Sequence, residues 1–336
     1  MQYRQRLRLG QTRPCIREGP RLRLASGFSR KKVLPMDATP AHVDFGPVTV
    51  YFGDRNGKYP DGNQVIVQGA DMRVAFDTPQ VSNHIGPALD DVDLVVLGHV
   101  HEDHLAGMHR LQRAAVQVHE ADLAAARSWE GLARHYGYPE PVLRGLHEKV
   151  VRDFNWVPRP DATAYRDGAR WDLGGGVRIT AWHLPGHTSG HSALLVEPVG
   201  LLFIGDIELS SFGPYYGDAT SDLRAFQRTL KEVARIPARI WVTSHHHGVI
   251  TERAAFEEAL TAFASRIEQR DAKLLGMLAA GPRTLDDLVA ERLLYPPGYA
   301  ELWIDAAERR TIAQHLELLQ EAGRVRLLEE RLWEAC

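Results

Sequence analysis

Short apolar runs bounded by turn residues recur along the chain from about residue 45. They are rich in Val, Ile, Leu and aromatic residues, a composition typical of β-strands. They predict strands at 47–52, 64–68, 72–77, 92–97, 116–118, 177–184, 193–197, 201–204 and 239–243. Gly69-Ala70-Asp71 predicts a hairpin turn between the second and third strands. No run reaches the roughly 18 to 20 apolar residues of a bilayer crossing, so we expect no membrane span.

Apolar residues at helical spacing lie between these strands. Helices are expected from about Leu105, twice within 120–155, from a cap at Thr220 or Ser221 to about Ile236, and at about 252–268. Gly137 and Pro139 separate the two helices within 120–155, which form either a lid beside a site or a plain connection. Strands interleaved with helices predict an α/β fold with two sheet halves covered by helices.

Beyond about residue 268 the pattern becomes mostly helical. Helices are expected near 270–278, 284–293 and 307–322, followed by a turn at Gly323 and two short strands. With 336 residues and 44% hydrophobic content, the chain is long enough for one large domain and a small appendage. We therefore expect a catalytic domain at 37–265 and a separate C-terminal domain at 266–336.

Charge is distributed unevenly along the chain. Residues 1–32 hold ten Lys or Arg against one Glu, which leaves 30 basic and 42 acidic residues elsewhere, a net charge of −12. We expect residues 1–36 to be a disordered, arginine-rich leader, or the product of translation begun upstream of a natural start near Met36. A targeting arm or an anion-binding tail is the functional alternative.

The acidic remainder repels polyanions, so a nucleic-acid partner is not expected unless a local basic patch exists. Cys15 and Cys336 lie near opposite ends of the chain, which argues against a disulfide framework or a cysteine metal site. Scarce cysteine fits a reducing cytoplasm, where we expect the protein to reside.

The most specific motif is His99-Val100-His101-Glu102-Asp103-His104, directly after the predicted buried strand 92–97 and Gly98. Imidazole and carboxylate are the ligands that zinc and its neighbours prefer. On an extended loop, His99 and His101 can face one point while Asp103 and His104 face a second. A loop at the carboxyl end of a buried strand is where open α/β sheets place their sites. The alternative interpretation, a polar loop in solvent, does not explain well why three histidines occur in this span.

Three further strand ends carry residues of the same type. They are His187 in Leu184-Pro-Gly-His-Thr-Ser-Gly-His191, Asp206 in Phe203-Ile-Gly-Asp206, and the histidines of Trp241-Val-Thr-Ser-His-His-His-Gly248. His183 and His191 have a simpler interpretation as hydrogen-bonded sheet residues, and Asp206 as a helix cap. A serine triad is disfavoured because no GxSxG elbow is present. Four strand ends together predict a metal site.

This succession of motifs resembles the metallo-β-lactamase superfamily, in its hydrolase branch. The resemblance rests on Asp77, HxHxDH at 99–104, PGHTSGH at 185–191, GD at 205–206 and SHHHG at 244–248, and it covers about residues 45–265. It implies an αββα sandwich with metals in a cleft along the shared edge of two sheets. The sequence departs from the family pattern at two places. Many members carry a hydroxyl residue at the position of Gly98, and a glycine pair is commoner at the position of Leu105-Ala106-Gly107. Neither departure removes a ligand.

The resemblance also implies a ligand set and two zinc ions, with iron or manganese as alternatives. One ion would be held by His99, His101 and His187. The other would be held by Asp103, His104 and His245, with Asp206 bridging the two and Asp77 supporting the loop. His246 and His247 stay open as alternative ligands or as substrate-facing acids.

Two ions about 3.5 to 4 Å apart can share a water and lower its pKa towards 7, so hydroxide is the expected nucleophile, oriented by Asp103 and Asp206. The loop 208–216 carries aromatic and small residues and is either a moderately apolar pocket wall or an ordinary packed loop. An ester, lactone or thioester of small size is the leading expected substrate. A metal-dependent endoribonuclease and a di-iron redox protein are the alternatives.

The C-terminal part resembles, more loosely, the winged-helix-like tail of the branch that includes endoribonucleases. From residue 266 onward it holds ten basic and thirteen acidic residues with the signs interspersed. A helix that reads a nucleic-acid groove is normally basic. Packing against the catalytic domain or against a second subunit in a homodimer is therefore the expected role of this part.

Overall fold

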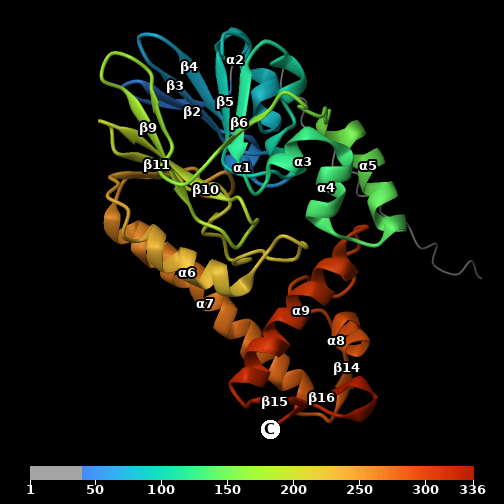
Figure 1. The fold of residues 1–336 in the computed structure, drawn as a ribbon. Helices are drawn as coiled ribbons and strands as arrows, with labels where there is room; N and C mark the ends of the chain where they lie inside the picture. The colour runs from blue at the N-terminus through green and yellow to red at the C-terminus, as the bar shows by residue number, and fades with distance from the viewer. Residues whose placement is uncertain (1–39) are drawn as a thin grey trace, which may run out of the picture. The chain divides into compact units, whose positions relative to one another are not determined.

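The structure, a computed structural model, describes residues 40–336 (Figure 1). The expected leader at 1–36 lies outside this range. The described residues belong to one compact unit. Within the described range, no helix has both the length and the apolar character that crossing a bilayer requires.

The first half of the described chain builds a seven-stranded sheet in the order β1-β2-β3-β4-β5-β6-β7. Its strands are β1 (His42–Phe45), β2 (Val48–Tyr51), β3 (Gln64–Gln68), β4 (Arg73–Phe76), β5 (Leu94–Leu97), β6 (Ala115–His119) and β7 (Thr163–Tyr165). The strands from β1 to β4 pair antiparallel, and those from β4 to β7 pair parallel. The expected hairpin is present, since Gln68 pairs with Arg73.

The second sheet has six strands in the order β13-β12-β11-β10-β9-β8. They are β8 (Arg170–Asp172), β9 (Arg178–His183), β10 (Ser192–Glu197), β11 (Leu201–Phe203), β12 (Ile240–Val242) and β13 (Val249–Ile250). Only the pair β11 and β12 is parallel in this sheet. The carboxyl ends of these two strands therefore meet at one edge, as those of β4 and β5 do in the first sheet.

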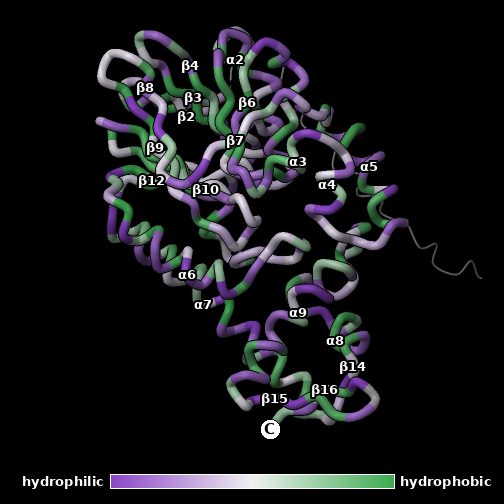
Figure 2. The backbone as a smooth tube through the Cα atoms, viewed as in Figure 1, coloured by the Kyte–Doolittle hydropathy of each residue, from purple (hydrophilic) through white to green (hydrophobic). Residues whose placement is uncertain are grey.

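The two sheets face each other across a shared apolar core. Phe76 of the first sheet and Phe203 of the second have ring centroids 5.8 Å apart, and both are fully buried. The helices α2 (Pro87–Asp90), α3 (Leu123–Arg127), α4 (Trp129–Tyr136) and α5 (Glu140–Phe154) contribute to the core on the first sheet's outer face. The helices α6 (Leu223–Val233) and α7 (Arg253–Leu278) do the same for the second sheet. Figure 2 shows green, hydrophobic stretches along the strands and purple ones in the connecting loops. The αββα sandwich is confirmed.

Some predicted helices differ in the structure. The helix expected from about Leu105 is replaced by two short 3-10 turns, Glu102–His104 and Met108–Arg110. The backbone there bonds to another segment, because Thr78 N–H donates to His104 O and Gly107 N–H donates to Thr78 O, both at 2.8 Å. Tertiary hydrogen bonds of this kind satisfy the groups that a helix would have paired internally.

Two further helix predictions are corrected by the structure. Residues 120–155 hold three helices, not two, although Gly137 does end α4 with a left-handed φ of 65°. The cap of α6 is Asp222, whose side chain accepts from Ala225 N–H, and neither Thr220 nor Ser221 takes that role. Ser221 instead donates its hydroxyl proton to His187 O at 2.6 Å. The residue chosen as a cap therefore supports a candidate ligand loop.

The C-terminal part contains α8 (Leu285–Glu291), α9 (Ile304–Glu321) and a three-stranded sheet in the order β14-β16-β15. Its strands are β14 (Arg283–Thr284), β15 (Val325–Leu327) and β16 (Leu332–Ala335). The helices expected near 252–268 and 270–278 are one continuous helix, α7, so the predicted domain boundary at 265 falls inside it. The mostly helical character is as expected, while the domain division and the winged-helix identity stay predictions.

Candidate metal centre

The predicted ligands lie on loops that follow strands of both sheets. His99 to His104 follow β5, Asp206 follows β11 and His245 follows β12, while His187 lies between β9 and β10. Because β5 and β11 belong to facing sheets, their carboxyl ends bring these loops to one shared edge. All seven predicted ligands come together there, in two neighbouring groups.

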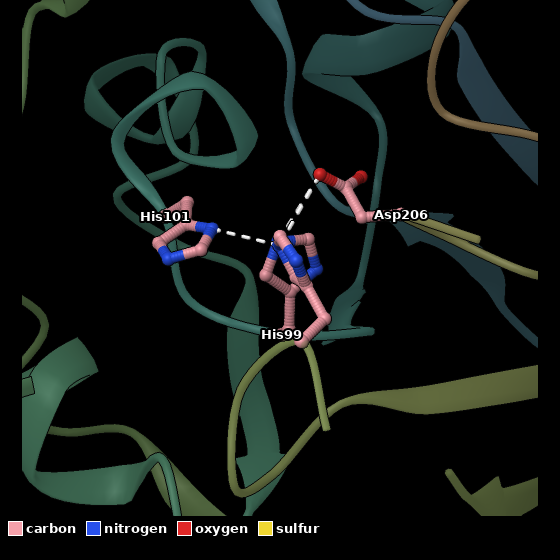
Figure 3. Close-up of side chains that lie close together, drawn as sticks. His99, His101 and Asp206 are labelled. Carbon is pink, nitrogen blue, oxygen red and sulfur yellow. Dashed lines mark hydrogen bonds and ion pairs between the residues drawn. The ribbon is translucent and has the colours of Figure 1, made fainter. Parts of the chain in front are cut away.

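The first group consists of His99, His101, His187 and Asp206, whose ligand atoms all lie within 4.8 Å of one another. His187 Nε2 is 3.0 Å from His101 Nδ1 and 3.3 Å from Asp206 Oδ2. His99 Nε2 is 3.9 Å from the same carboxylate oxygen. Figure 3 shows the side chains of His99 and His101, from the loop after β5, converging with that of Asp206, from the loop after β11.

The second group consists of Asp103, His104 and His245. His245 Nε2 lies 3.1 Å from Asp103 Oδ2, and His104 Nε2 lies 3.8 Å from the same oxygen. Both rings also face Asp206 Oδ1, at 3.1 Å for His104 and 3.5 Å for His245. Asp206 thus presents one carboxylate oxygen to each group, the arrangement of a bridging ligand.

The outer ring nitrogens of four histidines are bound to oxygen acceptors. His101 Nε2 donates to Asp218 Oδ2 at 2.8 Å, His104 Nδ1 to Asp77 Oδ2 at 2.8 Å, His187 Nδ1 to Tyr215 O at 3.0 Å, and His245 Nδ1 to Gly57 O at 2.7 Å. Acceptors at these positions fix the tautomer, so the lone pair of each neutral ring points into the cluster. Metal-binding histidines nearly always have such an outer partner.

This arrangement needs a cation inside the cluster. The facing nitrogens of His101 and His187 are 3.0 Å apart, and two lone pairs at that separation require a proton or a metal ion between them. His99 Nε2, His104 Nε2 and Asp206 Oδ1 are buried and have no hydrogen-bond partner among the described residues. Buried polar atoms are rarely left unpaired, and these converge on the same space. The residues therefore fit divalent metal ions that prefer imidazole and carboxylate.

The charges of the ligand side chains also indicate that the cluster needs positive charge. Burial disfavours ionised Asp206, yet His104 and His245 hold the pKa of its carboxyl well below its ordinary value. Burial also opposes charge on His245, but Asp206 and the hydrogen bond with Asp103 raise the pKa of this ring to about 10. Buried carboxylates here keep their negative charge and draw protons onto neighbouring rings. Divalent ions would supply that positive charge directly.

Asp77 has the supporting position that the resemblance implied. It follows β4, and its carboxylate accepts from Gly98 N–H at 2.7 Å and from His104 Nδ1–H at 2.8 Å. It also lies close to His99 and His104 as a group that metal could use. Since both oxygens already accept hydrogen bonds, Asp77 is placed to hold the ligand loop. Gly98 has no side-chain hydroxyl, so its backbone N–H supplies the hydrogen bond to Asp77 that supports the ligand loop.

The remaining histidines of the last motif point elsewhere. His246 Nε2 lies 3.5 Å from Glu208 Oε2, and His247 Nε2 lies 3.0 Å from Leu209 O. Burial, followed by the nearby charge of His245, lowers the pKa of His246 to about 4, which disfavours a role as an acid at neutral pH. His191 is a buried support, since Asp206 N–H donates to its Nε2 at 3.1 Å.

Sequence reasoning missed several residues that organise this centre. Asp218 accepts from His101 and from Tyr138, and it lies 117 residues from His101 in the sequence. Glu102, inside the HxHxDH motif, is buried and accepts from Tyr59 at 3.0 Å and from Tyr136. No spacing rule links these positions. Only the carboxylate and tyrosine content near the motif offered a signal, and it was not specific.

A buried arginine supports the loop that holds His187. Arg270 of α7 donates to Phe212 O at 2.8 Å, to Pro214 O, and to Tyr216 Oη at 2.8 Å. Its guanidinium also lies 5.2 Å from the centroid of the Tyr216 ring. These bonds fix the backbone just before Tyr215 and the side chain of Tyr216 just after it, and the carbonyl of Tyr215 accepts from His187. Arg270 is therefore a positioning residue for a candidate ligand.

A cavity of about 480 Å³ opens beside the centre. Its lining includes the candidate ligands His101, Asp103, His187, Asp206 and His245. Of the two interpretations of the loop 208–216, a pocket wall or an ordinary packed loop, the structure favours the wall, since Glu208, Ser210, Ser211, Phe212 and Tyr215 line the cavity. Further aromatic lining residues are Tyr59, Tyr136, Tyr138, Tyr295, Tyr299 and Trp303. This volume is within the range of about 300 to 1,000 Å³ typical of small-molecule sites.

Replacing Asp218 by asparagine is expected to weaken metal binding by about 10- to 100-fold, because His101 would lose the carboxylate that orients its ring. A competition titration against a chromophoric chelator measures this affinity. Asp161→Asn is the matched control, since Asp161 is half-exposed and pairs with Arg159. Equal affinity in Asp218→Asn and the parent protein would contradict this role.

Comparison with known proteins agrees with this geometry. A family model described as the metallo-beta-lactamase superfamily matches residues 79–260. An N-acyl homoserine lactonase of Bacillus sp is 24% identical over 143 residues, covering 42% of this chain and 46% of that protein. The acyl-coenzyme A thioesterase MBLAC2 of Bos taurus is 26% identical over 192 residues, covering 50% of this chain and 66% of that protein.

A solved structure extends the similarity beyond the matched family region. A metallo-beta-lactamase family protein from Thermus thermophilus superposes with a TM-score of 0.59 and 25% identity. The superposition covers 89% of this chain and 97% of that chain. That coverage exceeds what residues 79–260 alone account for, so part of the remaining chain is shared as well.

Proposed function

The chain belongs to the metallo-β-lactamase superfamily, and on this premise we propose that it is a binuclear zinc hydrolase of small esters, lactones or thioesters. The observation that carries the proposal is the position of Asp206. Its two carboxylate oxygens face two different groups of ligands, 3.3 Å from His187 in one and 3.1 Å from His104 in the other. A carboxylate in this position could bind one ion with each oxygen.

The proposed chemistry divides between the ions and the chain. Divalent ions in this site would supply Lewis acidity and hydroxide at neutral pH. His99, His101 and His187 would hold one ion, and Asp103, His104 and His245 the other, with Asp206 between them. Free carboxylate lone pairs of Asp103 and Asp206 would accept a proton from the attacking water and orient it. Zinc is the proposed metal because the donors are imidazole and carboxylate, although iron and manganese accept similar sets.

The cavity supports a small, largely uncharged substrate. Tyr59 and Tyr136 donate their hydroxyl protons to Glu102, and Tyr138 donates to Asp218, so these residues present ring surfaces to the cavity. Within residues 40–336, Lys58 is the single lysine or arginine that lines the cavity. A polyanion such as RNA would need more basic side chains along its path. The similarity to a lactonase and to a thioesterase also favours acyl substrates.

The test combines metal analysis with a substrate panel. Protein purified without chelator is expected to hold about two zinc equivalents and to hydrolyse an aryl ester, a lactone or a thioester. Chelator treatment should abolish turnover, and added zinc should restore it, because the ligands are supplied by the chain and remain in place. Cleavage of a short RNA alone, or two bound irons without hydrolysis, would contradict the proposed function while leaving the family unchanged.

A further inference from the structure

The C-terminal part of the chain contributes one wall of the cavity beside the metal centre. Tyr295, Pro296, Tyr299 and Trp303 all line this cavity. They lie on the segment between α8 and α9, or at the start of α9, and thus outside the region matched by the family model. The wall is therefore built from a part of the chain that the family model does not match.

Aromatic side chains continue from the centre to this wall. The ring centroids of His187 and Tyr215 are 5.8 Å apart, and those of Phe212 and Tyr295 are 5.4 Å apart. Tyr295 and Tyr299 are nearly parallel, with an interplanar angle of 4° and a centroid distance of 5.5 Å. Tyr299 remains 44% exposed, so the series reaches solvent. Exposed aromatic faces of this kind bind flat or apolar groups.

A buried carboxylate fixes the start of the wall. Glu308 of α9 is fully buried and accepts hydrogen bonds from three consecutive backbone N–H groups, at Leu293 (2.8 Å), Leu294 (2.9 Å) and Tyr295 (2.9 Å). Charge-assisted bonds are stronger than neutral ones, so this turn is firmly held. Tyr295 consequently has a defined position against Phe212, and the wall is part of the resting structure.

We propose that Tyr295, Tyr299 and Trp303 form the subsite for the uncharged apolar part of the substrate, such as its acyl chain or aryl ring. The side chains of these residues carry no charge and therefore offer no ion-pair partner to a carboxylate or phosphate group. Apolar lining with few polar groups selects ligands by shape and by buried apolar area. This inference rests on the proposed hydrolase function and adds the class of group that the substrate must carry.

The test uses a series of p-nitrophenyl esters from acetate to octanoate, together with benzoate. In the parent protein, kcat/KM is expected to rise with acyl size. Tyr299→Ala should lower kcat/KM for octanoate about tenfold, mainly through KM, and leave acetate within about twofold. Tyr299→Phe should retain the preference because it keeps the ring. Glu301→Gln is the matched control, since Glu301 lies in the same segment but does not line the cavity.

Glu308→Gln tests the anchor of the wall. We expect it to raise KM for octanoate while kcat for acetate and the metal content stay unchanged, a split that general destabilisation would not produce. Retention of the acyl preference in both Tyr299→Ala and Glu308→Gln would overturn the subsite. Benzoate distinguishes the two kinds of group, because a stacking site favours it over an alkyl ester of equal carbon number.

A binding measurement separates this inference from the proposed hydrolysis. Calorimetric titration with p-nitrophenyl octyl ether, which cannot be hydrolysed, is expected to show about tenfold weaker binding to Tyr299→Ala than to the parent. That result without ester turnover would support the subsite and contradict the hydrolase function. Turnover with no effect of Tyr299→Ala on ether binding would contradict the subsite alone.

Discussion

Changing Asp206 to asparagine is expected to lower kcat/KM for a small ester by about 10³-fold. The substitution keeps the size of the side chain but removes its negative charge and replaces one acceptor oxygen with a donor group. The two oxygens face His187 and His104 at 3.3 Å and 3.1 Å, so the change affects both groups of ligands. We expect at least one of the two metal equivalents to be lost. Steady-state kinetics and elemental analysis on the same sample measure the two effects.

Asp91→Asn is the control for this variant, because Asp91 is an exposed aspartate on the surface. It should keep both activity and metal content. The proposal would not survive if Asp206→Asn retained two metal equivalents and activity near that of the parent. Loss of activity with an unfolded circular dichroism spectrum would require the same measurement on Asp206→Glu, which preserves the charge but displaces the oxygens and should also lose most turnover.

Within the run of three histidines, His245→Ala is expected to reduce kcat/KM by about 10²- to 10³-fold and to release one metal equivalent. Its Nε2 atom lies 3.1 Å from Asp103, while its Nδ1 atom donates to Gly57 O. His246→Ala should change kcat/KM by no more than about threefold, because that ring contacts Glu208 at the edge of the cavity. Removing a ligand from such a cluster strongly lowers the affinity for the ion that the ligand would hold.

These adjacent variants form a matched pair, with the same residue type and the same side-chain truncation. Metal stoichiometry and kcat/KM for one ester measure the difference between them. A larger loss of metal and of kcat/KM in His246→Ala than in His245→Ala would show that His246, and not His245, is the ligand. Equally small effects of both variants on metal stoichiometry and kcat/KM would show that this loop supplies no metal ligand.

Much of the fold and of the centre was predictable because strand ends and ligand types are local features of the sequence. The buried run at 92–97 and the motif at 99–104 are adjacent in the chain, so the position of the ligand loop followed from the strand. His245 was preferred among three neighbours because it is the one that the family resemblance implies. Its position facing Asp103 is consistent with that choice.

Other features depend on contacts between distant segments and left no local pattern. The segment after Leu105 has apolar residues at helical spacing, but hydrogen bonds with Thr78 hold its backbone in turns. Asp218 reaches His101 only after the chain has passed through the first sheet and four strands of the second, β8 to β11. Glu308 and Tyr295 belong to a part that was expected to be separate, yet they shape the cavity of the sandwich.

The continuity of α7 has a thermodynamic consequence. Phe256 and Phe263 of this helix belong to the core under the second sheet, while Leu274 and Leu278 belong to the C-terminal core. Arg270, between these two pairs, holds the backbone beside Tyr215 and so the orientation of His187. Ions held by the ligand loops would therefore also stabilise the helix end that carries the tail. By linkage, if a ligand or subunit that binds the tail changes metal affinity by some factor, metal binding must change the affinity for that ligand or subunit by the same factor.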